Sequence, residues 1–350
     1  MNTDTRSLLV ALLVTTMVAI LDLWATGSAV LLGFLIAGPL LAAVSLDARR
    51  TAAVAAYAAV LAVLLGVPDG IFGTVDHVIR CLVVAFGGIF CTFIAERRSQ
   101  RERALLRITR VAEVAQRAIL RPVPGRAGRV TLAVRYLSAA EDSVVGGDFY
   151  DVAVTPYGVR LLVGDVKGKG LEAVQLAATV LGSFRQAAYS QEDLASLAAE
   201  LDRSASRQLG EEDFVTAVLA EFGRRGELKL VNCGHPPPLL LRGGAARPLD
   251  DQAPTTPLGL GPDPAVQRVT LAPADRLLLY TDGLVEARDG HGRPFEVDEQ
   301  AAAELLATPS LDQALDRLVA SVLRHAGGHL DDDLALVLAQ PRRVVLSRVA

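Results

Sequence analysis

Hydrophobic residues dominate the first hundred positions of the chain, and charged residues are almost absent there. Four apolar runs follow one another, at residues 8–21, 27–45, 51–67 and 81–95, the last extended back through His77 and Arg80. Such runs have about the length of a helix that crosses a bilayer. Pro39 is tolerable inside the second run, because neighbouring helices can satisfy the freed backbone groups. The pattern predicts a four-helix transmembrane region over residues 1–96.

Arginines between the runs orient this region. Residues 47–50 read DARR and residues 96–103 read ERRSQRER. The other connections carry no lysine or arginine outside the runs, and their charged or titratable residues are Asp22, Asp69, Asp76 and His77. Positively charged loops stay in the cytoplasm. We therefore expect a multi-pass protein of the cell membrane, with both termini and the soluble part in the cytoplasm.

Two features of the membrane region have a second interpretation. The first run could be a cleaved signal peptide, but no small-residue cleavage pattern precedes the next span. His77 and Arg80 could form a sensing pair within the membrane, because a charge buried there is costly and usually functional. A position at the outer interface is the simpler interpretation of both residues, and it is the one we favour.

The segment after the last run predicts a helix that leaves the membrane. From residue 97 to 120, apolar residues step by three and four at Leu105, Ile108, Ala112, Ala115 and Ile119, which gives a seam of two heptads. A homodimer through residues 97–120, or a helix packed on its own domain, would both account for the seam. Prolines and a glycine end this linker or signalling helix, assigned to residues 97–124.

Short strands and helices alternate irregularly from about residue 130 onward. Segments 129–137, 159–166, 213–222, 227–234, 275–282 and 334–339 have the pattern of strands, and segments 171–188 and 194–209 have the period of helices. The strands come in clusters instead of alternating strictly with helices. This order predicts an α+β domain with antiparallel sheets over residues 125–340, followed by a tail at 341–350.

Composition and charge exclude several classes of function. The 350 residues are 51% hydrophobic and carry a formal net charge of −4, so bulk electrostatics give no argument for nucleic-acid binding. The three cysteines, Cys81, Cys91 and Cys233, are too few and too scattered for a disulfide framework, and they lack the paired spacing of a zinc site. We expect each to be a small buried apolar residue.

Four aspartates lie at the ends of apolar strands, next to glycine or another acid. They are Asp148 in GGDFYD, Asp165 in VGDVKGKG, Asp282 in YTDGLVEA and Asp332 in DDDLALV. Taken singly, these motifs also fit a glycine bulge, an anion-binding loop, a tight turn and a solvated loop.

Taken together, the four carboxylates indicate a metal centre. Carboxylates that converge at one rim repel each other unless a cation neutralises them. An all-oxygen ligand set suits Mg²⁺ or Mn²⁺, and a pair of such ions can activate water for an in-line phosphoryl displacement. His235 is the only histidine in a notable motif, NCGHPPP, so a serine or cysteine triad has little support.

Five motifs in order resemble a known family. VVGGDFYDV, GDVKGKGLEA, VNCGHPPPLLL, LLLYTDGLVEA and DDDLALVL look like the SpoIIE-type branch of the PPM (protein phosphatase 2C-like) metal-dependent serine/threonine phosphatases. The resemblance covers roughly residues 112–340. It implies an αββα sandwich, two antiparallel sheets flanked by helices, with two Mn²⁺ or Mg²⁺ ions at one end.

The resemblance also implies a role for particular residues. Asp165 would bridge both metals, and the carbonyl of Val166 would add a ligand. Asp282 and Asp332 would hold one metal, and Asp148 would bind on the other side, directly or through water. Water activated by the metals would then attack phosphorus without a phosphoenzyme.

Several positions depart from the family pattern. Lys169 stands where the family often has histidine, and a histidine acts as general acid near Lys167 in the wider superfamily, so the two lysines are candidates to attract the phosphate. Ala335 replaces a usual threonine. Arg135 is a weak candidate for the phosphate-binding arginine of the eukaryotic members. Asp331 and Asp333 are the alternatives to Asp332, which we choose because two acids then precede the apolar strand as in the family.

The combined prediction is a membrane-anchored phosphatase that acts on phosphoserine or phosphothreonine of a cytoplasmic regulatory protein. In this family such targets are often anti-sigma-factor antagonists, so this target class rests on the resemblance. One rival is a diguanylate cyclase, because residues 146–149 read GGDF, but no acid follows the aspartate. A degenerate phosphatase-like receptor is a second rival. A transporter is a third, for which four short spans make a poor pathway.

Overall fold

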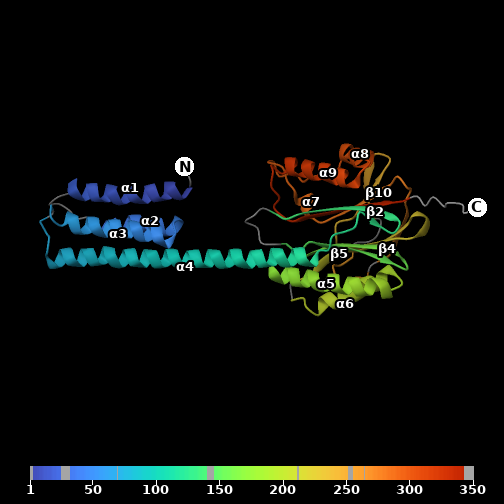
Figure 1. The fold of residues 1–350 in the computed structure, drawn as a ribbon, viewed down its shortest axis with the longest axis horizontal. Helices are drawn as coiled ribbons and strands as arrows, with labels where there is room; N and C mark the ends of the chain where they lie inside the picture. Colours follow the sequence, from blue (N-terminus) through green and yellow to red (C-terminus); the bar gives the residue numbers. More distant parts are fainter. Residues whose placement is uncertain are drawn as a thin grey trace, which may run out of the picture. The chain divides into compact units, whose positions relative to one another are not determined.

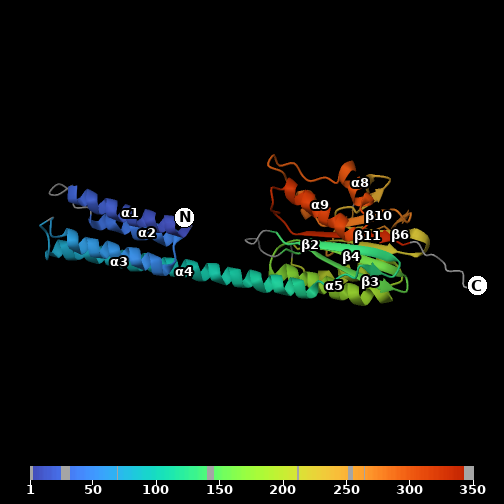
Figure 2. The same ribbon diagram turned by 45° about the horizontal axis from the view of Figure 1, so that its top comes forward.

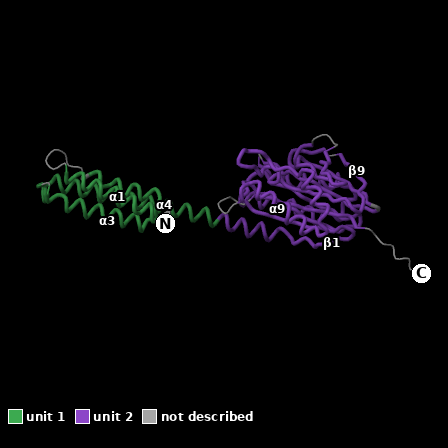
Figure 3. The backbone as a smooth tube through the Cα atoms, turned by 90° about the horizontal axis from the view of Figure 1, so that it is seen from above, with its two compact units in different colours: residues 1–107 green, residues 108–350 purple. Residues whose placement is uncertain are grey.

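The computed structural model forms two compact units. The structure describes residues 3–24, 32–68, 70–139, 146–210, 213–250, 255–263 and 265–342. Unit 1 comprises Met1–Arg107 and unit 2 comprises Ile108–Ala350 (Figure 3). We describe each unit by itself.

Unit 1 is built from apolar helices. They are α1 (Thr3–Trp24), the 3₁₀ helix η1 (Leu32–Ile36), α2 (Ala37–Ser45), α3 (Ala48–Leu65) and the first part of α4 (Val75–Ile119). Small residues let these helices approach closely. At Gly38 of α2, an added Cβ would lie 1.7 Å from the Thr15 hydroxyl of α1.

The prediction of four membrane-spanning helices is wrong for the second run. Among the described residues, three helices are long and apolar enough to cross a membrane, α1, α3 and α4, and the second run contributes only the shorter helix Gly33–Ser45. Proline lacks a backbone N–H and fits best in the first turn of a helix. Helix α2 accordingly begins two residues before Pro39, after a 3₁₀ turn. Residues 27–31 of the predicted run lie outside the described residues.

The outer surface of unit 1 is strongly apolar. Leu13, Val44 and Phe86 are each 65–72% exposed. A contiguous apolar surface of this kind is unfavourable in water and is typical of contact with a membrane. The helices therefore indicate that this part of the chain associates with a membrane.

Helix α4 joins two segments that the sequence analysis treated separately. It runs over 45 residues without interruption, from the fourth apolar run through the predicted linker helix. In unit 2, Ala112 of α4 packs against Val174 of α5 (Leu171–Ser190). Leu105 and Ile108, which the predicted seam also included, remain 65% and 55% exposed.

Unit 2 contains two antiparallel sheets. Sheet A has the strand order β1 (Arg126–Ala127), β2 (Val130–Leu137), β11 (Leu334–Pro341), β10 (Arg276–Tyr280), β7 (Leu239–Arg242) and β8 (Ala245–Pro248). Sheet B has the order β3 (Phe149–Thr155), β4 (Gly158–Val166), β5 (Val215–Phe222), β6 (Glu227–Cys233) and β9 (Gln267–Thr270). All neighbouring pairs among these strands are antiparallel.

Helices cover the outer face of each sheet. Helices α5 and α6 (Leu194–Ser206) pack on sheet B, and α8 (Glu299–Ala307) and α9 (Leu311–His325) pack on sheet A (Figure 1, Figure 2). Two short helices, η2 (Arg224–Gly226) and α7 (Gly283–Glu286), lie in connections. The predicted α+β sandwich of two antiparallel sheets flanked by helices is confirmed.

Strand β4 shows why its sequence is a continuous apolar run. Leu161 and Val163 face the core between the two sheets, whereas Leu162 faces the core beneath α5 and α6. Successive side chains of a strand point to opposite faces. Because both faces of β4 are covered, all three residues are fully buried.

The strand register brings the four predicted aspartates to one end of the sandwich. In sheet B the start of β3 meets the end of β4, with Phe149 opposite Gly164, so Asp148 and Asp165 are neighbours. In sheet A the end of β10 meets the start of β11, with Tyr280 opposite Leu336. Asp282 follows β10 and Asp332 precedes β11, so each sheet contributes two carboxylates.

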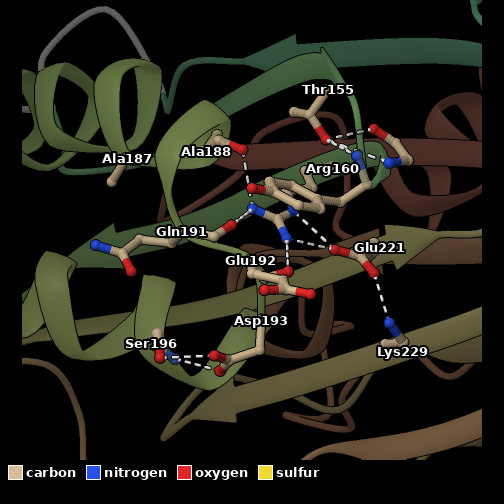
Figure 4. A network of polar contacts seen from close by, with 12 residues as sticks. Thr155, Arg160, Ala187, Ala188, Gln191, Glu192, Asp193, Ser196, Glu221 and Lys229 are labelled. Atoms are coloured by element: carbon tan, nitrogen blue, oxygen red, sulfur yellow. Dashed lines mark hydrogen bonds and ion pairs between the residues drawn. The ribbon is translucent and has the colours of Figure 1, made fainter.

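A buried arginine joins α5 to the other half of β4. Arg160 is completely buried and forms an ion pair of 2.6 Å with Glu221 of β5. Its guanidinium also donates to the carbonyl oxygens of Ala188, Gln191 and Glu192 at the end of α5 (Figure 4). Ala188 lies in the last turn of α5, where carbonyls lack intrahelical partners, and Gln191 and Glu192 directly follow the helix. Arg160 therefore fixes the end of α5 on sheet B.

Candidate metal centre

Three of the predicted aspartates converge at the end of the sandwich. Asp148, Asp165 and Asp282 each offer a carboxylate oxygen, and these oxygens all lie within 4.8 Å of one another. Asp148 precedes β3, Asp165 is the second-to-last residue of β4, and Asp282 is the N-cap of α7. Loops that leave a rigid sheet therefore hold the three carboxylates in place.

Mutual repulsion and burial disfavour negative charge in this cluster. The pKa of Asp165 is raised to about 7, by burial and by the charges of Asp282 and Asp332. Burial and the charge of Asp165 raise the pKa of Asp148, which is fully buried. Burial also raises the pKa of Asp282, together with the charges of Glu286 and Asp332. A divalent cation would remove this repulsion, and the all-oxygen donor set fits a hard ion such as Mg²⁺ or Mn²⁺.

Asp332 lies at the edge of the cluster and is paired with a lysine. Its carboxylate is 2.9 Å from Lys169 Nζ, and both side chains are partly exposed. Asp332 is outside the group of three aspartates, but its charge reaches Asp165 and Asp282. Asp331, one of its two alternatives, is exposed.

Asp333, the other alternative, is buried and tied to the surrounding backbone. It accepts hydrogen bonds from the Tyr136 hydroxyl and from the backbone N–H groups of Ala139 and Gly146. Burial and the charge of Asp333 strongly raise the pKa of Tyr136, so this hydroxyl remains a donor. Asp333 thus fixes the backbone at Gly146, the first residue of the GGD motif. Of the three consecutive aspartates, Asp332 is the one whose charge acts on both Asp165 and Asp282.

The backbone of the GGD motif packs directly on the end of β4. A Cβ added to Gly147 would lie 2.5 Å from the carbonyl oxygen of Val166 and 2.8 Å from its backbone nitrogen. Only glycine allows this approach. The Val166 side chain is buried.

The two candidate lysines occupy different surroundings. Lys167 Nζ lies 5.3 Å from the centroid of the Phe214 ring, whereas Lys169 pairs with Asp332. The hydrogen bond and charge of Asp332 raise the pKa of Lys169, so its ammonium group stays charged at neutral pH.

Two polar residues that the sequence analysis missed hold Asp148 in place. The Thr281 hydroxyl donates to Asp148 Oδ2 at 2.6 Å, and itself accepts from the Ala335 backbone N–H at 2.8 Å. Gln116 Nε2 of α4 lies 3.1 Å from the Gly146 carbonyl oxygen and 3.4 Å from that of Asp148. Thr281 was recognisable as the residue before Asp282. The only signal for Gln116 was a polar residue within the apolar seam.

Arg135 does not reach the cluster. It pairs with Asp312 and Asp316 of α9, on the helix-covered face of sheet A. Strand β2 presents this side chain away from the space between the sheets, so the interpretation of Arg135 as a phosphate ligand is wrong.

The remaining residues of the motif GGDFYD have structural roles. Phe149 is fully buried in the core beneath α5 and α6. Asp151 pairs with Arg185 of α5 at 2.5 Å, and Arg185 also donates to the carbonyl oxygen of Ile119 at the end of α4. A diguanylate cyclase carries its GGDEF motif on a hairpin in a βαβ-rich domain. Here Asp148 instead precedes β3 of an antiparallel sheet, so the cyclase interpretation does not fit.

Comparison with known proteins agrees with the fold and the cluster. The family described as Stage II sporulation protein E (SpoIIE) matches residues 155–342 of the chain. The solved structure of the RsbU and RsbW domains of Rv1364c from Mycobacterium tuberculosis is 30% identical, with a TM-score of 0.53 over 61% of this chain and 60% of that one. The chain thus matches about three-fifths of that protein's length.

Two more distant structures share the fold. The SiaA-PP2C domain of Pseudomonas aeruginosa is 24% identical, with a TM-score of 0.57 over 71% of this chain and 99% of that domain. The S. agalactiae serine/threonine phosphatase is 12% identical, with a TM-score of 0.50 over 61% of this chain and all of that one. The family match covers more than half of the chain, and the fold agrees with it. The chain therefore belongs to the SpoIIE family of PPM-type, metal-dependent protein serine/threonine phosphatases.

Proposed function

We propose that this protein is a membrane-anchored phosphatase that hydrolyses phosphoserine or phosphothreonine on a cytoplasmic regulatory protein. The observation that carries the proposal is the convergence of Asp148, Asp165 and Asp282 within 4.8 Å, at one end of the family's sandwich. Family membership supports the reaction, and the apolar helices of unit 1 support the anchor.

Two Mn²⁺ or Mg²⁺ ions are the proposed cofactors. Asp165 is the proposed bridging ligand, with the Val166 carbonyl beside it, and Asp282 and Asp332 would hold one ion. Asp148 would hold the other side of the centre. Such a pair of ions supplies activated water and stabilises the charge of an in-line phosphoryl displacement. The raised pKa values of Asp148, Asp165 and Asp282 support this assignment, because they show a cluster that lacks positive charge.

Lys167 and Lys169 are proposed to attract the phosphate group. Both follow Asp165 on the loop that opens α5. Lys169 is partly exposed and stays protonated, which favours a fixed positive charge over a proton donor. Its ammonium can reach a phosphate oxygen by leaving Asp332, since the lysine side chain is flexible.

The proposed substrate is an anti-sigma-factor antagonist. This class follows from the SpoIIE family, to which the chain belongs, and from its likeness to a structure that contains an RsbU and an RsbW domain. Since function is a property of sites and not of folds, the test must use the phosphorylated protein itself.

The phosphatase domain and both termini are proposed to be cytoplasmic. Asp4 at the start of α1 pairs with Arg50 of α3 at 2.6 Å, and Arg98 of α4 donates to the Leu46 carbonyl oxygen at 2.9 Å. The basic residues therefore gather at the end of unit 1 where α1 begins, and such clusters stay in the cytoplasm. Protease protection of tags at both termini, in intact and in opened cells, measures this orientation. A tag cleaved from outside would contradict it.

A homodimer through residues 97–120 is the proposed assembly. Leu105 and Ile108 of the predicted seam lie one turn apart on α4 and are 65% and 55% exposed, whereas Ala112 packs on Val174. A second copy would bury Leu105 and Ile108. Light scattering of the detergent-solubilised chain should give a dimer for the wild type and a monomer for Ile108→Glu. A monomeric wild type would refute the assembly.

The decisive experiment measures phosphate release by the full chain in detergent. We expect Mn²⁺-dependent release from a phosphoserine protein, and we expect Asp165→Asn to lower kcat by at least about a hundredfold, because the proposed bridging ligand is lost. The matched control is Asp263→Asn, an exposed aspartate of a loop, which should leave the rate unchanged.

Each other outcome identifies a different function. Full activity of Asp165→Asn would refute the site. Mn²⁺ binding without phosphate release would identify a degenerate receptor, and formation of a cyclic dinucleotide from nucleoside triphosphate would identify a cyclase.

A further inference from the structure

His235 is buried between the two sheets, and the proposed reaction gives it no role. It follows β6 in the motif NCGHPPP and is 5% exposed. Asn232 fixes its backbone on both sides, because Asn232 Oδ1 accepts from the His235 N–H at 2.7 Å and Asn232 Nδ2 donates to its carbonyl oxygen at 2.8 Å. The backbone that carries the imidazole is therefore held in one place.

Both ring nitrogens of His235 have hydrogen-bond partners. Nε2 lies 3.0 Å from the Tyr280 carbonyl oxygen, and Nδ1 lies 2.9 Å from Thr216 Oγ1. A carbonyl oxygen only accepts, so Nε2 carries the hydrogen and donates it. Burial lowers the pKa of His235 to about 4, so the ring is neutral and Nδ1 accepts from the Thr216 hydroxyl.

The two partners of the His235 ring lie close to Asp165 and Asp282 in the strand pairing and along the chain. Thr216 of β5 lies directly opposite Asp165 in the pairing of β4 with β5, and its hydroxyl is 3.4 Å from the Asp165 carbonyl oxygen. Tyr280 is the last residue of β10, two positions before Asp282. His235 thus joins the ends of strands from different sheets, next to the carboxylate cluster.

We propose that His235 is a positioning residue that sets the separation of Asp165 and Asp282. The neutral imidazole acts as a spacer of fixed length, with Thr216 on sheet B and the Tyr280 carbonyl on sheet A. The inference rests on the proposed metal centre and adds a residue that touches neither metal nor substrate. Loss of a partner that orients a metal ligand typically lowers metal affinity by about ten- to a hundredfold.

The test is the affinity of the metal-free full chain for Mn²⁺, measured by calorimetry in detergent. Thr216→Val removes the hydroxyl at nearly constant volume, and Thr216→Ser keeps it. We expect Thr216→Val and His235→Gln to weaken Mn²⁺ binding by about tenfold or more, and Thr216→Ser to restore it. We also expect Thr216→Val to lower kcat and to leave the KM for the phosphoprotein unchanged.

The control is a second threonine with a hydrogen-bonded hydroxyl. The Thr308 hydroxyl donates to the Glu304 carbonyl oxygen within α8, so Thr308→Val loses a comparable hydrogen bond away from the cluster. It should bind Mn²⁺ as the wild type does. If His235→Gln does not fold, the pair of variants at Thr216 still decides.

Two results would overturn the inference, and they differ in meaning. Wild-type affinity in folded Thr216→Val would overturn the role of His235 alone. A wild type that binds no Mn²⁺ would overturn the proposed metal centre and this inference with it.

Discussion

At the scale of single residues, the cluster depends on backbone atoms that approach unusually closely. Gly147 lies against Val166 where a Cβ would be 2.5 Å from the carbonyl oxygen. The same carbonyl is a proposed metal ligand, so Gly147 packs directly against a group that would bind metal. A side chain at position 147 must displace the end of β4.

We expect Gly147→Ala to lower both the affinity for Mn²⁺ and phosphatase activity, by about tenfold or more. The added methyl group collides with backbone atoms, which cannot move as a flexible side chain could. Calorimetry and phosphate release measure the two effects.

The matched control is Gly182→Ala in α5, where an added Cβ meets nothing within 4 Å. There alanine should stabilise the helix by up to about 1 kcal/mol and leave Mn²⁺ affinity unchanged. Equal Mn²⁺ affinities in the two variants would contradict the close contact at Gly147.

The carboxylates of the cluster could be predicted from the sequence, whereas the residues that hydrogen-bond to them could not. Asp148, Asp165 and Asp282 each end or begin a recognisable apolar strand, and they do converge. Gln116 comes from a helix that precedes the sandwich, and its contact with Gly146 exists only after the domain has folded. Arg135 had the right charge, but the strand's alternation turned it towards α9.

At the scale of elements, Arg160 connects three of them. It lies on β4, pairs with Glu221 on β5 and caps the end of α5. A buried ion pair stabilises a fold only when its remaining hydrogen bonds are satisfied. Here the carbonyl oxygens at the end of α5 satisfy them, and Lys229 also pairs with Glu221.

We expect Arg160→Met to destabilise the phosphatase domain by about 3–5 kcal/mol, because it leaves Glu221 buried with one partner fewer. Denaturant unfolding measures the loss, and hydrogen exchange should quicken at the end of α5. Adding Glu221→Leu to this variant should recover part of the stability, since no buried charge then remains at that position.

The control for Arg160 is Arg203→Met, which removes a surface pair with Glu200. It should cost less than about 1 kcal/mol. If Arg160→Met cost no more than this surface variant, the network in β4 and α5 would not contribute to stability.

The boundaries of helices and strands agreed with the sequence prediction where a single hydrophobic pattern defined the element. The alternation of β2 and the continuous apolar run of β4 matched their predicted ranges closely. Within the described residues, the second apolar run forms only the 3₁₀ helix η1 and the short helix α2, and Pro39 lies in the first turn of α2. The last apolar run and the linker helix form one helix, because neither proline nor glycine lies between them.

At the scale of the whole molecule, the charge of the metal-free cluster links stability to pH. The pKa of Asp165 is raised to about 7 in the folded protein, against about 4 for an unfolded aspartate. Between these values the folded state binds a proton that the unfolded state releases. The contribution of Asp165 to stability is therefore fully present below pH 4 and is lost as the pH rises through 7.

We expect the metal-free protein in chelator to unfold at a lower temperature at pH 8 than at pH 5.5. His235 opposes this trend below about pH 6.5, because its lowered pKa means that the unfolded chain then binds a proton that the folded protein does not. The contribution of Asp165 is therefore read as the difference from Asp165→Asn, which keeps His235. Mn²⁺ should raise the unfolding temperature more at pH 8, where fewer protons compete for the cluster.

Asp165→Asn is the control for this pH dependence, because the amide does not titrate. It should flatten the dependence in chelator. A wild type with the same pH dependence as Asp165→Asn would show that the cluster carries no excess charge.

The two units of the chain differ in how much of their structure could be predicted from the sequence. Motifs separated by many residues identified the sandwich, because each motif lies at a strand end that antiparallel pairing brings to the same edge. The helices of unit 1 have no such motifs, and composition alone does not distinguish a full crossing from the shorter helix α2.

Strand β11 has a consequence for the timing of synthesis. It is the last strand in sequence among the described residues, yet it lies between β2 and β10 inside sheet A. While the ribosome is still making the residues before 334, β2 and β10 have no strand between them and Asp332 has no fixed place. We therefore expect the proposed phosphatase activity to appear only after translation has passed Pro341, because β11 completes sheet A and Asp332 directly precedes it.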